Sequence, residues 1–204
     1  MKKIALIAFL LAVCVAAGRA QESRQDISLS GTGLIEPFIG SSTNVYVSAN
    51  RAFGGLVSYR FMLTPSSAFE ANYGITYQNT IRFKSNSVYN TNVLTRTQEI
   101  SGAYVRTFNF RKFNPFVEGG PGALIFMPIR NSGTKGEYAF EVKQQTQIAA
   151  VYGAGIAYEI SPSFDIRAEY RGLVTKVPTF GESQLNTNKW YNIYEPTIGV
   201  AYHF

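Results

Sequence analysis

The charged residues of this 204-residue chain fall mainly at alternate positions within apolar runs. In residues 164–174 the charges are Asp165, Arg167, Glu169 and Arg171, separated by apolar or small residues. Alternate side chains of a strand point to the same face, so these four charges would share one face of a sheet. Neighbouring carboxylates there could perform acid–base catalysis or line an ion path. The mixed signs instead favour salt bridges, because buried charges require partners.

Charges of the same kind recur along the chain, on the side of each run opposite its apolar residues. The predicted inward-facing set is Asp26, Arg60, Glu70, Glu99, Glu118, Asp165, Arg167, Glu169, Arg171 and Glu195. We expect these side chains to form an interior charge network that holds a narrow structure together, rather than a catalytic carboxylate pair.

Two further features could indicate catalysis. His203 is the only histidine, so a serine–histidine or histidine–metal site has one candidate, and it stands at the end away from the long polar connections. The sequence Gly119-Gly120-Pro121-Gly122 lacks the Lys-Ser/Thr pair and the following helix of a phosphate-binding loop, so strand packing accounts for it better. We therefore predict a non-enzyme without catalytic residues, cofactor or metal site.

The charged positions belong to about eight runs of alternating polarity, which predict eight strands. The runs are residues 26–35, 53–62, 69–78, 94–108, 115–126, 145–160, 164–174 and 190–204. Short turns follow the second, fourth and sixth runs. Long polar stretches, residues 36–50, 82–92, 128–143 and 176–189, follow the others. Strictly alternating short and long connections indicate one all-β domain of antiparallel, up-and-down strands.

Residues 1–20 have the pattern of a cleaved signal peptide, with Lys2 and Lys3 before an apolar stretch and Gly18-Arg19-Ala20 as the cleavage site. The stretch is too short to span a membrane comfortably. Its removal leaves residues 21–204 as one domain and lowers the formal charge from +6 to about +3, so no nucleic-acid partner is indicated. The single cysteine, Cys14, lies within this peptide, and Val13 before it argues against a lipid attachment site.

Alternation alone does not say which face of the sheet meets lipid or water. Export, connections that are short at one end and long at the other, aromatic residues near the strand ends, and Gly, Ala and Ser on the polar faces all favour a membrane barrel. A closed barrel pairs every backbone group, as lipid requires, and runs of ten residues can cross at a tilt.

The chain ends on an aromatic residue within its last alternating run. Thr197, Gly199, Tyr202 and Phe204 match the spacing polar–x–Gly–x–x–aromatic–x–aromatic. On this motif the chain resembles the small OmpA-like outer-membrane barrels of Gram-negative-type bacteria over its whole mature length. The resemblance implies a closed antiparallel up-and-down transmembrane β-barrel of about eight strands. It also implies both termini in the periplasm and recognition of the last strand by the barrel assembly machinery. Pro121 and Pro196 depart from regular strands, and we expect them at bulges.

The favoured function is a non-enzymatic, integral outer-membrane barrel with a salt-bridged interior, in contact with outer-membrane lipid and lipopolysaccharide. It would contribute to envelope integrity, or to contact with a surface partner through four long outer loops. Tyr89, Tyr138, Phe140 and Phe180 in those loops could be adhesive contacts or could pack the loops together. Alternatives are a narrow channel for small solutes or ions, a membrane-embedded lipid-modifying enzyme that would use His203, and a soluble ligand-binding barrel.

Overall fold

The computed structural model describes residues 24–40, 45–85, 89–133 and 141–204. These residues form ten strands and one short 3-10 helix. They are β1 (Gln25–Leu34), β2 (Ile39–Gly40), β3 (Val45–Ala49), β4 (Ala52–Thr64), β5 (Ser67–Ser85), β6 (Tyr89–Thr107), β7 (Phe113–Gly133), β8 (Gln145–Ser161), β9 (Phe164–Lys176), η1 (Ser183–Leu185) and β10 (Trp190–His203). The predicted signal peptide and the motif around Cys14 lie outside the described residues.

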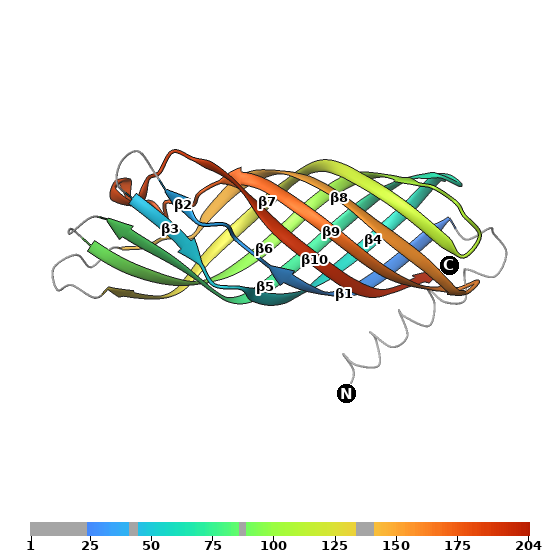
Figure 1. Cartoon of the computed structure of the whole chain (residues 1–204), viewed down its shortest axis with the longest axis horizontal. Coiled ribbons are helices and arrows are strands. Elements are labelled where there is room, and N and C mark those ends of the chain that lie inside the picture. Colours follow the sequence, from blue (N-terminus) through green and yellow to red (C-terminus); the bar gives the residue numbers. More distant parts are fainter. Residues whose placement is uncertain (1–23, 41–44, 86–88, 134–140) are drawn as a thin grey trace, which may run out of the picture.

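Eight strands form a closed antiparallel barrel, which confirms the predicted fold class. Their order around the wall is β5-β4-β1-β10-β9-β8-β7-β6, and pairing of β5 with β6 closes the circle (Figure 1). Following paired residues once around, from Asp165 on β9, leads back to Thr175 on the same strand. This displacement of ten residues tilts the strands, and an eight-stranded barrel leaves an interior that side chains can fill.

The two ends of the barrel differ, and we call them the turn end and the loop end. The turn end carries the short connections after β4, β6 and β8 and the carboxyl terminus, as Figure 1 shows. Phe204 is fixed there, because its N–H donates to the Gln25 carbonyl at 2.9 Å. The loop end carries β2, β3 and η1. Among the described residues, no helix is long and apolar enough to cross a membrane.

An apolar belt surrounds the barrel on its outer face. Its exposed aromatic residues include Phe53, Tyr77 and Trp190 toward the loop end, and Phe61, Phe69, Tyr104 and Phe164 toward the turn end. At the loop-end rim, the Arg96 guanidinium lies over the Tyr77 ring and the Lys176 ammonium over the Trp190 ring. Aromatic residues bordered by cations are the pattern of a membrane interface.

The predicted loops are shorter than expected, because strands continue into them. Residues 82–92 belong mostly to β5 and β6, and β7 extends through residues 128–133. The sequence pattern did not predict these extensions, because their outward-facing residues are polar. Beyond the belt the strands no longer alternate between apolar and polar residues. Residues 36–50 contain β2 and β3, and residues 176–189 contain η1.

Pro121 and Pro196 do not lie at bulges, contrary to expectation. Pro121 pairs with Ala150 and Pro196 with Tyr170 in unshifted registers. On its other side, each proline lies where the pairing of its strand is interrupted: Pro121 toward β6 and Pro196 toward β1. A proline has no N–H to donate to that neighbour. The register shifts lie at Met62/Thr64, Thr76/Asn79, Leu94/Thr95 and Glu159/Ser161.

The shift between Thr76 and Asn79 changes what β5 presents to the interior. Gln78 occupies it with φ of 60°, and beyond it Asn79, Ile81 and Phe83 are buried inside the barrel. One extra residue in a strand reverses which side chains face inward beyond that point. The positions that carry apolar side chains on the outer face before Gln78 therefore carry them on the inner face after it.

The loop-end half of the interior is therefore an apolar core. Its fully buried members include Ile81, Phe83, Val93, Phe126, Leu173, Phe180, Leu185 and Ile193. Phe180 packs edge-to-face on Phe83, with ring centroids 6.1 Å apart. The segment between β9 and β10 is held inward by Gln145, whose Oε1 accepts the N–H groups of Thr179 and Phe180. Phe180 thus packs the loop and is not a surface contact, whereas Tyr138 and Phe140 lie outside the described residues.

Candidate functional site

Arg171 of β9 lies at the centre of the barrel interior with no exposed side-chain surface. Its Nη1 is 2.7 Å from Oε2 of Glu195 on the adjacent β10, and its Nη2 is 2.7 Å from Oε1 of Glu99 on β6. Its Nε is 3.1 Å from Oε1 of Glu118 on β7. Inward positions of four strands therefore place one guanidinium among carboxylates from three other strands. The geometry uses the planar donor fork of arginine.

Hydroxyl groups complete this central cluster. The Thr32 hydroxyl of β1 donates to Glu195 Oε1 at 2.8 Å, and the Ser101 hydroxyl donates to Glu99 Oε1 at 2.7 Å. Glu169 is two residues before Arg171 on β9 and faces the same side of the strand. Its Oε1 lies 3.8 Å from Arg171 Nε. Thr32 and Ser101 were not among the predicted residues, although their alternation with outward apolar neighbours placed them on the inward face.

A second cluster lies at the turn end. Arg167 forms two parallel hydrogen bonds with Asp26, at 2.9 and 2.7 Å, joining β9 to β1. His203 Nε2 lies 2.8 Å from Asp165 Oδ2, and its Nδ1 lies 3.8 Å from Asp26. His203 is thus part of a charged cluster at the turn end, the end away from the long connections, as predicted. Among the described residues, the partners of its ring are Asp165 and Asp26, and no serine or cysteine hydrogen bonds to it.

Between the two clusters, Arg60 of β4 pairs with Glu70 of β5. The two side chains are hydrogen bonded at 2.7 Å and are directly opposite each other in the ladder. The Arg60 guanidinium also lies over the Phe116 ring, 4.8 Å from its centroid. The structure thus places all of the predicted inward charges inside the barrel, in three groups stacked from the turn end to its middle.

The interior charges do not balance. Arg60, Arg167 and Arg171 face seven carboxylates, those of Asp26, Glu70, Glu99, Glu118, Asp165, Glu169 and Glu195. Within the residues that the structure describes, no set of three His, Cys, Asp or Glu side chains has the arrangement of a metal site. An aqueous path through this interior would favour cations over anions, because its fixed charge is negative.

One acidic residue lies apart, just beyond the loop end of β1. Glu36 accepts a hydrogen bond from Asn79 Nδ2 at 2.5 Å, beneath the apolar core. Burial raises the pKa of Glu36 to about 7, against the lowering effect of the Asn79 hydrogen bond. Neither Glu36 nor Asn79 was singled out from the sequence, because the register shift that turns Asn79 inward has no clear sequence signal.

The four C-terminal motif residues lie on β10 or directly after it, where β10 closes against β1. Thr197 and Gly199 pair with Thr32 and Ser30 of β1. A Cβ at Gly199 would lie 2.3 Å from the Leu29 carbonyl oxygen, so only glycine permits this approach. Tyr202 faces outward, with its ring 5.1 Å from that of Phe164 and 6.0 Å from that of Phe204.

Known barrels share this architecture. Neisserial surface protein A is 14% identical, with a TM-score of 0.57 over 89% of this chain and 98% of that one. The Pseudomonas aeruginosa outer membrane protein OprG is 9% identical, with a TM-score of 0.59 over 90% and 97%. The Yersinia pestis attachment invasion locus protein Ail, solved with the heparin analogue sucrose octasulfate, is 15% identical, with a TM-score of 0.53 over 90% and 100%. No curated protein sequence matches the chain significantly.

A family model gives the assignment that these fold similarities alone do not. The model for the outer membrane protein beta-barrel domain matches residues 5–204, nearly the whole chain. With the closed eight-stranded wall and the apolar outer belt, this match confirms the predicted family and localisation. The chain belongs to the outer membrane protein beta-barrel family and is an integral protein of the outer membrane.

Proposed function

We propose that this protein is a non-enzymatic, non-conducting structural barrel of the outer membrane, with its turn end in the periplasm and its loop end outside the cell. The observation that carries the proposal is Arg171, which joins carboxylates of β6, β7 and β10 across the lumen. In these ion pairs the charged groups are partnered by each other instead of by water. The apolar core of the loop-end half adds a second closure, since an apolar interior does not hold a continuous file of water.

Ion flux into liposomes tests this proposal. The mature chain, refolded and inserted, should give no potassium or chloride flux above empty liposomes, while its heat-modifiable band shows that the barrel is folded. Sustained flux from the folded wild-type protein would overturn the proposal in favour of the narrow channel. That channel should then be cation-selective because of the excess of interior carboxylates.

The loop end supports a second, surface-binding role for polyanions. Beyond the belt, the described cations are Arg51, Arg82, Lys84, Arg96, Arg130, Lys143, Lys176 and Lys189, against only Glu141 and Glu182 as described acidic residues. Arg82 of β5 and Arg130 of β7 are exposed and flank neighbouring positions of β6, and neither is ion-paired to a described residue. Two unpaired cations about two strands apart suit sulfate or phosphate groups of a polymer.

Retention on immobilised heparin tests this surface role. The folded protein in detergent should be retained at low salt and released by salt, because screening weakens exposed charge contacts. An Arg82→Ala, Arg130→Ala double variant should elute at clearly lower salt. Arg111→Ala, Lys112→Ala, which removes the same charge from the turn end, should elute like the wild type. Equal elution of both double variants would contradict a role for this part of the surface.

A further inference from the structure

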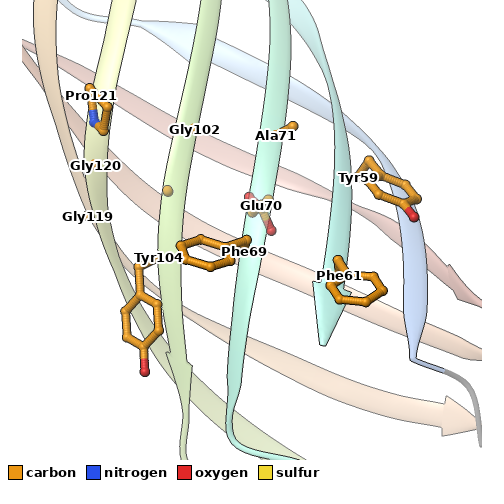
Figure 2. A pocket seen from close by; sticks show the side chains of 11 residues that line it. Tyr59, Phe61, Phe69, Glu70, Ala71, Gly102, Tyr104, Gly119, Gly120 and Pro121 are labelled. Atoms are coloured by element: carbon orange, nitrogen blue, oxygen red, sulfur yellow. The ribbon is translucent and has the colours of Figure 1, made fainter. Parts of the chain in front are cut away.

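The outer surface of the barrel is hollowed over β4, β5, β6 and β7 toward the turn end. The hollow has a volume of about 540 Å³. Tyr59, Phe69, Tyr104 and Pro121 stand around it, and Ala71 and Gly102 lie between them as small outward-facing residues, as Figure 2 shows. Phe69 and Tyr104 contact each other edge-to-face, with centroids 6.0 Å apart. Because the hollow lies within the apolar belt, hydrocarbon and not water is its natural content.

The backbone itself produces this hollow. The ladder between β6 and β7 is interrupted between Ser101/Gly122 and Tyr104/Gly119, the stretch that contains Pro121. Gly120 approaches β6 so closely there that a Cβ would lie 2.0 Å from the Gly102 carbonyl oxygen. Gly102 has no such constraint, since its own Cβ would meet nothing nearer than 3.9 Å. The absence of a side chain at Gly102 therefore leaves open space, without being required by the backbone.

An unpaired cation lies beside the hollow on its turn-end side. Arg106 is outward-facing and exposed, and its Nη1 donates to Ser67 Oγ at 2.9 Å. The Tyr104 hydroxyl, on the wall of the hollow, donates to the same oxygen at 2.9 Å. Arg111 and Lys112 follow in the turn between β6 and β7. None of these three cations forms an ion pair with a described residue.

We propose that the hollow seats one acyl chain of a phospholipid, with the phosphate of that lipid bound by Arg106. The chain would lie on Ala71 and Gly102 between the aromatic walls, and the Arg106 guanidinium would donate hydrogen bonds to the phosphate oxygens at the headgroup depth. An apolar seat directly beside an unpaired cation matches the two parts of a phospholipid. The proposed orientation makes this a lipid of the periplasmic leaflet.

Native mass spectrometry of the mature barrel refolded in detergent tests the proposal with dioleoyl phosphatidylglycerol as the probe. The wild type should retain one lipid per barrel. Gly102→Leu fills the hollow and Arg106→Gln removes the charge, and each should lower retention about tenfold, the effect of losing one charge-assisted or well-packed contact. Gly55→Leu is the matched control, because Gly55 is also a belt glycine whose Cβ would meet nothing nearer than 3.8 Å. Lys112→Gln is the matched charge control.

Retention that is equal in the wild type, Gly102→Leu and Gly55→Leu would overturn the proposal, as would a barrel dimer in place of the lipid-bound monomer. The heat-modifiable band of each variant shows that it is folded before it is measured. The measurement in detergent does not depend on membrane orientation or on conduction. A negative result would therefore overturn the lipid site and leave the closed-barrel proposal standing. The closed-barrel proposal is overturned separately, by ion flux through the folded protein.

Discussion

Arg171 on β9 reaches across the barrel lumen to Glu99 on β6, with Nη2 of the arginine 2.7 Å from Oε1 of the glutamate. Two further strands, β8 and β7, separate β9 from β6 in the wall, so this contact crosses the interior instead of following the sheet. The same guanidinium contacts Glu118 and Glu195. One side chain thus links β9 to β6 and β7, which backbone hydrogen bonds do not join to β9 directly.

Replacing Arg171 by Ala should destabilise the barrel by about 3–5 kcal/mol, because Glu99, Glu118 and Glu195 would be left as buried carboxylates without their shared cation. Arg171→Lys should recover only part of this, since an ammonium lacks the planar fork that meets several carboxylates at once. Urea unfolding of the refolded protein in detergent measures both. The control is Arg130→Ala, an exposed arginine outside the belt, which should change stability by less than about 0.5 kcal/mol. A similar small effect for Arg171→Ala would refute the central role of this residue.

Adding a methyl group at Gly199 should impair barrel closure. A Cβ there would lie 2.2 Å from Ser30 Oγ and 2.3 Å from the Leu29 carbonyl oxygen, so β10 and β1 would have to move apart. Overpacking of this kind costs about 1–3 kcal/mol. Gly31→Ala is the matched control on the same strand pair, because its Cβ would meet nothing nearer than 3.9 Å. The readout is the heat-modifiable fraction after refolding. Equal fractions for both alanine variants would contradict the steric requirement at Gly199.

Alternation in the sequence predicted the strands of the barrel wall. Together with the features that favour a membrane barrel, which decide the face that meets lipid, it also predicted which charges point inward. It did not predict the loop-end core. There the register shift at Gln78 exchanges the faces of β5, and a single residue in a left-handed conformation leaves no periodic trace.

The expected bulges at Pro121 and Pro196 show a second limit. The absence of an N–H predicts a missing hydrogen bond but not how the strands accommodate it. Here both prolines keep their register with one neighbour and leave a ladder gap toward the other. The hollow beside Pro121 follows from such a gap together with the small outward-facing residues Ala71 and Gly102 on neighbouring strands, a coincidence that only the three-dimensional register reveals.

The stability of the loop end should fall as the pH rises from about 4.5 to about 7, because of Glu36. Its pKa in the folded barrel is about 7, above the ordinary value of a glutamate, so the folded state holds a proton that the unfolded chain has already released. At about 1.4 kcal/mol per pKa unit, the contribution lost by pH 7 is at most about 3.5 kcal/mol. Glu36→Gln keeps a neutral partner for Asn79 and removes the titration.

The test is the temperature of the heat-modifiable transition at pH 5 and pH 8 for both proteins. The decrease between these pH values should be smaller in Glu36→Gln than in the wild type, because the variant lacks the titrating carboxyl group. The same decrease in both proteins would show that Glu36 does not carry the pH dependence.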